Sequence, residues 1–197
     1  MKPEYCPVNK GTQNAIMTDS ELILGCKKGN SACEYELFRR YGGRLFTVCR
    51  RYARHSMEAE DWLQDSFIRI FEKIDQYRGE GSFEGWMRRV TVHVILKKIK
   101  KSQYQNEQYP EDGLPDQGVS PDALMLLSEE EILDLIAKLP DGYRVVFNLA
   151  AIEGYSHKEI AEMLGIQEVT SRSQLAKARK WLQREIVKNN SEKIRTA

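Results

Sequence analysis

Apolar residues recur at helical spacing along most of this 197-residue chain, and the pattern does not indicate a series of strands. In the segment 57–76, Leu63, Phe67, Ile70 and Ile74 follow one another at steps of 4, 3 and 4 residues, which places them on one buried face of a helix. The chain is therefore predicted to be all-α. After a first helix that begins at Thr18, helices are predicted at about 31–55, 57–76, 83–101, 129–138, 141–152, 157–164 and 168–187.

Several helix ends are marked by capping residues. The pattern S/T-x-x-E predicts a capping box, in which the hydroxyl and the glutamate side chain each accept a hydrogen bond from the other residue's backbone N–H. Ser56 is expected to cap the helix that follows it. Gly154 and Gly165 stand where helix C-terminal caps belong. The three predicted boxes are Thr18/Glu21, Ser128/Glu131 and Ser156/Glu159.

A stretch of different composition separates two helical domains. Residues 102–127 contain three prolines, two glycines and no basic residue, which is typical of a flexible acidic linker. The predicted organisation is an N-terminal arm at 1–18, a first domain at 19–101, the linker at 102–127, a second domain at 128–187 and a C-terminal tail at 188–197.

Charge is spread unevenly, although the whole chain carries 30 basic and 29 acidic residues and a net charge of +1. Residues 19–101 hold 17 Lys and Arg against 12 Asp and Glu, residues 102–131 hold none against 8, and residues 132–197 hold 11 against 8. Two basic blocks joined by an acidic connector indicate a nucleic-acid partner more strongly than the total charge does.

The four cysteines lie in the first quarter of the chain without CxxC spacing, and the three histidines are scattered, so no metal site is predicted. Reduced thiols in a cytoplasmic protein are expected, with Cys33 and Cys49 packed on helices. No apolar run reaches membrane-spanning length, and the N-terminus lacks a secretory signal. The cysteines are Cys6, Cys26, Cys33 and Cys49, and the histidines are His55, His93 and His157.

The second domain contains a helix-turn-helix pattern. A short helix that begins at Ser156 is followed by Gly165, which allows a tight turn, and then by a longer helix. The predicted inner face of the longer helix comprises Ser171, Leu175, Ala178 and Leu182.

The outer face of the longer helix is polar and basic, and in helix-turn-helix proteins this helix lies in the major groove. Arg172 can bond guanine bidentately and Gln174 adenine, whereas Lys177 and Lys180 suit phosphates. A solvated amphipathic helix is the alternative interpretation of such a face. The candidate DNA-binding residues are Arg172, Ser173, Gln174, Lys177, Arg179 and Lys180.

The segment SFEGWMRRVTVHVILKKIKK (82–101) carries six basic residues and one acidic residue. Phe83, Trp86, Val90 and Val94 step by 3, 4 and 4 and are expected in the core, although Trp86 is equally suited to stack on an unpaired base. The candidate DNA-binding residues of the first domain are Trp86, Arg88, Arg89, His93, Lys97 and Lys98.

The helix at 57–76 leaves Asp61, Gln64, Asp65, Ile68 and Glu72 on its outer face. An acidic and amide-bearing face with an exposed isoleucine suits docking on another pair of helices. A solvated face is again the alternative.

Two long blocks resemble one protein family. LPDGYRVVFNLAAIEGYSHKEIAEMLGIQEVTSRSQLAKARKWLQREI (139–186) resembles region 4 of bacterial sigma factors of the extracytoplasmic-function (ECF) group of the sigma-70 family. AEDWLQDSFIRIFEKIDQYRGEGSFEGWMRRVTVHVI (59–95) resembles region 2 of the same group. The likeness covers about 19–101 and 128–187, and the lack of a bulky middle domain is typical of the ECF group.

The resemblance implies a dissociable subunit that binds core RNA polymerase, directs it to specific promoters and promotes DNA strand opening. The implied partners are the beta-prime clamp helices and the beta flap of core RNA polymerase, promoter DNA, and an anti-sigma factor. It implies no enzyme activity, cofactor, metal, small-molecule substrate or membrane insertion, and it agrees with a cytoplasmic protein.

The resemblance also implies roles for the candidate residues. Region 4 reads the minus-thirty-five element through the six candidate residues of the longer helix of the helix-turn-helix, which we call the reading helix. Region 2 recognises the minus-ten element through the six candidate residues of the segment 82–101. The family usually has asparagine where this sequence has His93, near the pocket for a flipped minus-ten base, and the loop at 77–82 helps define that pocket. The acidic linker would thread the basic channel of the polymerase. The residues implied to bind core polymerase are Asp61, Gln64, Asp65 and Ile68.

Two other functions are weighed against this one. A stand-alone helix-turn-helix transcriptional regulator would account for 139–186 but leaves the block at 59–98 unexplained. A nucleic-acid enzyme would need a carboxylate cluster, a His/Cys metal spacing or a phosphate-binding glycine loop, and the sequence shows none of these.

Overall fold

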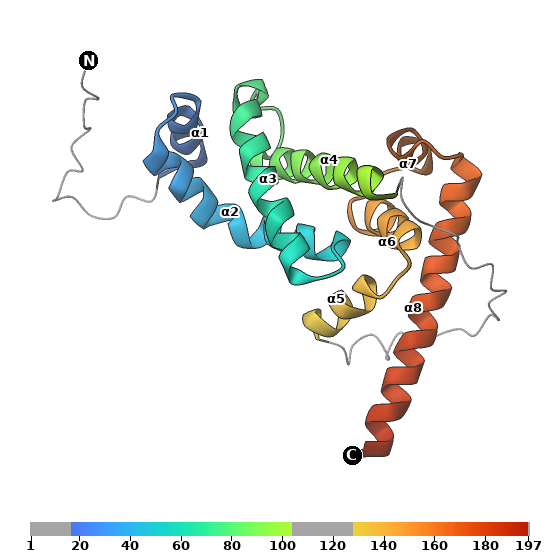
Figure 1. Ribbon diagram of the computed structural model, residues 1–197. Helices are drawn as coiled ribbons and strands as arrows, with labels where there is room; N and C mark the ends of the chain where they lie inside the picture. Colours follow the sequence, from blue (N-terminus) through green and yellow to red (C-terminus); the bar gives the residue numbers. More distant parts are fainter. Residues whose placement is uncertain (1–16, 104–127, 197) are drawn as a thin grey trace.

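The fold is that of a computed structural model, which describes residues 17–103 and 128–196. All regular structure in these two segments is helical (Figure 1), which confirms the all-α prediction. Nearly all of the predicted arm and linker lies outside the described residues. The helices are α1 (Asp19–Lys27), α2 (Ser31–Tyr52), α3 (Ser56–Lys73), α4 (Phe83–Gln103), α5 (Glu129–Ala137), α6 (Asp141–Phe147), α7 (His157–Leu164) and α8 (Glu168–Thr196).

The three capping boxes form as predicted. In each box the hydroxyl accepts a hydrogen bond from the glutamate N–H, and the glutamate carboxylate accepts one from the backbone N–H of the capping residue. The prediction that Ser56 caps α3 is wrong. His55 is the N-cap, because its backbone is extended at φ −153° and its Nδ1 accepts a hydrogen bond from the Glu58 N–H at 3.2 Å.

Some helices end differently from their predicted bounds. The sequence predicts one helix over 141–152, but α6 ends at Phe147 and continues as a π-helical turn (Asn148–Ile152). The last residues of the predicted helix at 57–76 form a 3-10 turn (Ile74–Gln76). The predicted tail at 188–197 is largely a continuation of α8, which runs to Thr196.

Helices α1 to α4, which we call the first module, surround one apolar cluster. Helix α3 packs against α2 and α4, and α1 packs against α2. Aromatic contacts extend the cluster, with the rings of Phe38 and Phe67 4.8 Å apart. Its most deeply buried members are Leu22, Leu37, Tyr41, Leu45, Phe67, Ile70, Ile74 and Met87.

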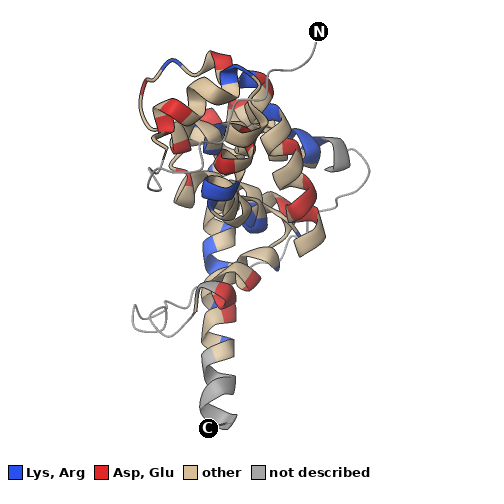
Figure 2. Cartoon of the chain, turned by 90° about the vertical axis from the view of Figure 1, so that its left-hand side faces the viewer, with Lys and Arg blue, Asp and Glu red and all other residues tan. Residues whose placement is uncertain are grey.

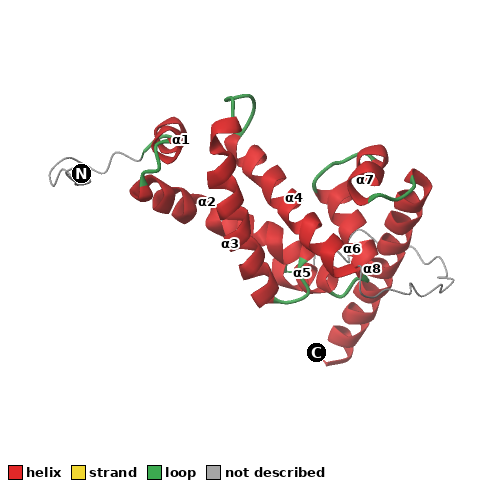
Figure 3. Cartoon of the chain, turned by 45° about the horizontal axis from the view of Figure 1, so that its top comes forward, coloured by secondary structure: helices red, strands yellow, loops and turns green. Residues whose placement is uncertain are grey.

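Helices α5 to α8, which we call the second module, pack directly on the first. In Figure 1, α6 lies beside α4, and Figure 3 shows α7 near the end of α4. The two modules share a single apolar cluster. From the first module it contains Tyr52, Trp62, Val92, Ile95 and Leu96, and from the second Val145, Val146, Leu149, Ile160 and Leu175.

The apolar stripe expected on α4 is only partly correct. Phe83 is buried, but Trp86, Val90 and Val94 are only partly buried. The fully buried stripe begins at Met87 instead, because α4 lies between α3 and the second module and is covered on two sides. The residues that α4 buries are Phe83, Met87, Thr91, Val92, Ile95, Leu96 and Ile99.

The described cysteines are free thiols packed inside the first module. Cys33 and Cys49 lie buried on α2, as predicted, and Cys26 is buried on α1. Burial raises the pKa of Cys26 to about 11 and that of Cys49 to about 12. Since the thiolate is the reactive form, these two side chains are inert near neutral pH. None of the helices in the described segments is long and apolar enough to span a membrane.

Candidate nucleic-acid interface

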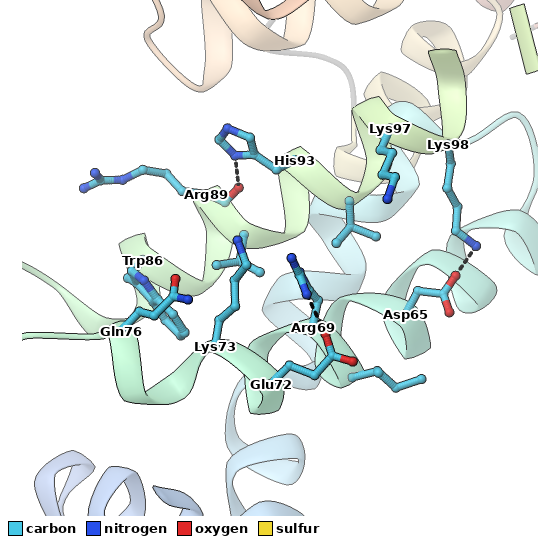
Figure 4. A pocket seen from close by; sticks show the side chains of 13 residues that line it. Asp65, Arg69, Glu72, Lys73, Gln76, Trp86, Arg89, His93, Lys97 and Lys98 are labelled. Atoms are coloured by element: carbon cyan, nitrogen blue, oxygen red, sulfur yellow. Dashed lines mark hydrogen bonds and ion pairs between the residues drawn. The ribbon is translucent and has the colours of Figure 1, made fainter. Parts of the chain in front are cut away.

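An open groove of about 820 Å³ runs between α3 and α4. The side chains that line it are drawn in Figure 4. Arg69 and Lys73 come from α3, and Arg89 and Lys97 come from α4. The partly buried valines of α4, Val90 and Val94, line the apolar part of the groove. Cations beside apolar and aromatic surface suit a nucleic-acid strand, because phosphates and base faces need both kinds of contact.

Three aromatic rings pack together at the Trp86 end of the groove. The ring centroids of Tyr77 and Phe83 are 5.0 Å apart, those of Tyr77 and Trp86 5.6 Å, and those of Phe83 and Trp86 5.8 Å. Phe83 is buried beneath, while Trp86 lines the groove. The loop before α4 is held by the Tyr77 hydroxyl, which donates to the Gly81 carbonyl at 2.8 Å. Trp86 is thus fixed with part of its ring available for stacking.

The candidate cations of α4 fall into two groups. Arg89 and Lys97 line the groove and have no ion-pair partner among the described residues. Arg88 lies outside the groove, and its Nε is 3.0 Å from Oε2 of Glu153 in the second module. Lys98 forms an ion pair with Asp65 across the groove (Figure 4). The structure therefore leaves Arg89 and Lys97 as the cations most available to a phosphate.

His93 lies on the exposed side of α4 between Arg89 and Lys97, and it also lines the groove. Its Nδ1 is 2.7 Å from the Arg89 backbone carbonyl (Figure 4). A carbonyl oxygen only accepts, so Nδ1 carries the proton. In the neutral ring Nε2 is then an acceptor, which can bond a donor on a nucleic acid.

The outer face of α3 carries an exposed stripe. Asp61, Gln64 and Ile68 are exposed, and the side chain of Ile68 is 57% accessible. Asp65, the fourth predicted polymerase contact, is turned toward Lys98 instead. Met57 was missed by sequence reasoning. It is 75% accessible and lies one turn before Asp61 on the same stripe, so the spacing of 4, 3 and 4 residues could have revealed it.

The helix-turn-helix forms from α7 and α8 as predicted. Gly165 adopts the left-handed conformation at φ 73°, and its N–H donates to the Ala161 carbonyl at 2.8 Å. The two helices are also joined by a contact that sequence reasoning missed, in which Nδ1 of His157 lies 2.9 Å from the hydroxyl of buried Ser171. The inner face is apolar around this bond and includes Ile160, Leu175 and Ala178.

The outer face of α8 is only partly open. Arg172, Ser173 and Arg179 are exposed, and the Arg172 guanidinium pairs with Glu168 one turn earlier. That hydrogen-bonded pairing lowers the pKa of Glu168. Gln174 is half-buried and lines a small cavity together with Leu96 and other residues of α4.

The last two candidates on α8, Lys177 and Lys180, are partly buried along the same helix. Figure 2 shows basic and acidic residues interspersed over both modules rather than gathered on one face. Local pairing therefore decides which cations are available to a phosphate.

Comparison with known proteins identifies both modules. The family described as "Sigma-70 region 2" matches residues 37–104, and "Sigma-70, region 4" matches residues 129–182. The matches thus cover the groove helices and the helix-turn-helix, in that order along the chain.

Curated relatives carry related names. ECF RNA polymerase sigma factor SigE of Mycolicibacterium smegmatis is 30% identical over 167 residues, a match that covers 82% of this chain and 65% of the relative. This chain thus spans just under two thirds of that relative's length. ECF RNA polymerase sigma factor SigM of Mycobacterium tuberculosis is 26% identical over 180 residues, a match that covers 91% of this chain and 90% of the relative.

Among solved structures, a sigma factor RpoE crystallised with the anti-sigma factor NepR from Bartonella quintana aligns over 77% of this chain and 96% of its own, with 18% identity and a TM-score of 0.47. Regions 2 and 4 both match in their proper order, and the relatives that span the chain bear ECF names. The chain therefore belongs to the sigma-70 family of RNA polymerase sigma factors, in its extracytoplasmic-function group.

Proposed function

We propose that this chain is an ECF sigma factor that binds core RNA polymerase, directs it to specific promoters and promotes strand opening. One observation carries the proposal: a single chain holds both an aromatic and basic groove matched by region 2 and a helix-turn-helix matched by region 4. A regulator that only reads duplex DNA would have no use for the groove. As a subunit of the polymerase the protein would act in the cytoplasm.

In the proposed mechanism the groove between α3 and α4 holds unpaired bases of the minus-ten element. Arg89 and Lys97 would bind the phosphates, and Trp86 would stack on a base. Extruding a base costs a few kcal/mol, and capture in the groove offsets that cost. Strand opening is then a population shift driven by binding, and the chain itself makes and breaks no covalent bond.

The second module would read the minus-thirty-five element through the exposed N-terminal part of α8. Arg172 is the strongest candidate for a base contact, because it is exposed and only has to exchange Glu168 for a base edge. Ser173 and Arg179 are exposed on the same helix, whereas Gln174 is half-buried at a small cavity that it shares with α4.

Core polymerase would dock on the exposed stripe of α3, which mixes the apolar side chains of Met57 and Ile68 with the polar ones of Asp61 and Gln64. Such a mixture is typical of protein–protein interfaces. We include the beta-prime clamp helices, the beta flap and an anti-sigma factor among the proposed partners on the basis of the family.

The test is run-off transcription with core polymerase on a library of promoter fragments. Arg172→Ala is expected to lower promoter selectivity, since a good bidentate base contact contributes about 1–3 kcal/mol of discrimination. Arg184→Ala, an exposed position farther along α8, is the matched control and should leave selectivity unchanged.

Asp61→Ala is expected to weaken core binding without changing selectivity, with Asp75→Ala, also exposed, as its control. Promoter footprints by the chain alone, equally strong without core polymerase, would overturn the proposal in favour of a stand-alone regulator.

A further inference from the structure

The reading helix carries an apolar side chain where it is proposed to meet DNA. Val169 lies in the first turn of α8 (Glu168–Thr196), and it is 73% accessible. Among the described residues of the second module, no other large hydrophobic side chain is so exposed. A valine in such a place buries little apolar surface, and its β-branched side chain makes it a weaker helix former than alanine, glutamate or lysine. Neither packing nor helix formation therefore accounts for Val169.

Val169 belongs to one exposed stripe of α8. At the start of this helix the exposed side chains are those of Val169, Arg172, Ser173 and Ala176. Their spacing of 3, 1 and 3 residues places them on the same side of the helix. The other side is held by buried Ser171, whose hydroxyl lies 2.9 Å from Nδ1 of His157 in α7. Because α7 fixes the rotation of α8 in this way, Val169 and Arg172 face away from the fold together.

Val169 is also close to the residue that is proposed to read a base. Helix-turn-helix proteins contact base edges with the N-terminal residues of this helix. Val169 precedes Arg172 by three residues, which is about 4.5 Å along a helix axis, and successive base pairs are about 3.4 Å apart. A base touched by Val169 would therefore lie within about one or two base pairs of the base bound by Arg172.

Only one base offers an apolar group to a valine in the major groove. Thymine carries its C5-methyl group there, whereas guanine, adenine and cytosine present hydrogen-bond donors and acceptors. The valine side chain can neither donate nor accept a hydrogen bond, so next to those bases it would displace water from a polar group without replacing it. Against thymine it instead removes two apolar surfaces from water at once. The chemistry of Val169 is therefore suited to thymine.

We propose that Val169 is a specificity-determining residue that selects a thymine of the minus-thirty-five element through its C5-methyl group. This thymine lies beside the base that Arg172 binds. The inference rests on the proposed function and adds to it one base of the promoter sequence. Burying a single methyl group strengthens binding roughly fourfold, which sets the size of the expected preference.

Deoxyuridine tests this contact, because it lacks only the C5-methyl group of thymine and keeps its base pairing. The minus-thirty-five element is first selected from a promoter library by the holoenzyme, and the position at which Arg172→Ala relaxes the selection marks the base bound by Arg172. Each thymine of the element is then replaced by deoxyuridine in turn. One replacement, within about two base pairs of the marked position, should weaken promoter binding by the native holoenzyme roughly fourfold.

Val169→Ser removes the methyl groups of the protein and keeps a similar helix propensity. We expect it to bind the thymine promoter roughly fourfold more weakly than the native holoenzyme does. It should be insensitive to the same deoxyuridine replacement, so that the two changes are fully coupled. Val169→Ile keeps the apolar contact and should keep the sensitivity. Val187→Ser makes the matched change at a valine farther along α8, which is 43% accessible, and should bind both promoters as the native protein does.

Three results would overturn the assignment: a native holoenzyme that is insensitive to every deoxyuridine replacement, a sensitivity that persists unchanged in Val169→Ser, and an element without thymine near the base bound by Arg172. A Val169→Ser variant that loses affinity for core polymerase but keeps the methyl sensitivity would make Val169 a protein contact, which also overturns it. Failure of the proposed function gives a different result, because the native chain would then bind no core polymerase and select no promoter. The assignment would fall with it, whereas a selective holoenzyme that ignores the methyl group overturns the assignment alone.

Discussion

Two neighbouring arginines of α4 lie in opposite environments. Arg88 pairs with buried Glu153, whereas Arg89, one residue later, lines the open groove between α3 and α4 and has no ion-pair partner among the described residues. The contact to which Arg88 belongs, here called the junction, joins Arg51, Tyr52 and Arg88 of the first module to Arg144, Asn148 and Glu153 of the second. Successive helix residues point about 100° apart. A basic run on a helix is therefore divided by phase between structural pairing and availability to a ligand, and its net charge does not measure the strength of a DNA site.

The same comparison separates the junction from the groove as a whole. At the junction every cation meets a buried partner, so its removal should be felt in stability. In the groove Arg89 and Lys97 are exposed and have no ion-pair partner among the described residues, so their removal should be felt in binding and leave folding unaffected. A loss of stability on mutating a groove cation, or a loss of DNA binding without a loss of stability on mutating a junction arginine, would contradict this distinction.

The largest effect is expected at Arg144. Replacing it with methionine keeps the apolar stem but removes hydrogen bonds to the carbonyls of Tyr52, Ala137 and Leu139, which are 2.9, 3.0 and 3.0 Å away. Removing one partner from a buried charged network costs about 3–5 kcal/mol. We expect a loss of about 3 kcal/mol in the free energy of unfolding, measured by urea denaturation.

The control for this change is Arg184→Met, which alters an exposed arginine on α8 and should shift stability by less than about 0.5 kcal/mol. Equal losses at the two positions would mean that the junction contributes nothing specific to the folded state.

A smaller effect is expected at Trp86, on the groove side of the comparison. Trp86→Ala should shorten the lifetime of the open promoter complex, since stacking of an aromatic side chain on a base contributes about 1–3 kcal/mol. Heparin-challenge measurements on the holoenzyme report that lifetime. Trp86→Phe keeps an aromatic face and should retain most of it. A short lifetime in both variants would assign Trp86 to packing with Tyr77 and Phe83 instead.

Local signals in the sequence predicted much of this structure. The capping boxes and the glycine turn of the helix-turn-helix depend on residues within a few positions of each other, and they form as expected. The exposed stripe of α3 likewise follows from helical spacing. These features need no knowledge of distant parts of the chain.

The junction could not be predicted in this way. Arg144 bonds a carbonyl 92 positions earlier, and Arg51 pairs with a glutamate 102 positions later. Nothing local distinguishes Arg88 from Arg89 or marks Glu153 as buried. The stripe on α4 was misjudged for the same reason, since the second module covers a side of the helix that spacing alone leaves open. Sequence reasoning therefore recovers helices and their caps but not the partners that helices find across the fold.

The smallest expected effects come from a matched pair of neutralisations, Arg54→Gln beside the junction and Lys97→Gln in the groove. The Arg54 side chain is 57% accessible and pairs with Asp141. The Asp141 side chain is only 10% accessible but keeps its pairing with Arg144 when Arg54 is replaced. The solvent-facing Arg54 therefore contributes about as much as an exposed pair, about 0.2–1 kcal/mol, so stability should fall by about 0.5 kcal/mol and single-stranded DNA binding by the holoenzyme should not change. Lys97→Gln should do the reverse. It removes one phosphate contact, which lowers the slope of log K against log salt by about 0.7, and it leaves the urea midpoint unchanged. A stability loss at Lys97, or a change of salt slope at Arg54, would show that accessibility and pairing do not divide the basic residues of this chain between folding and DNA binding.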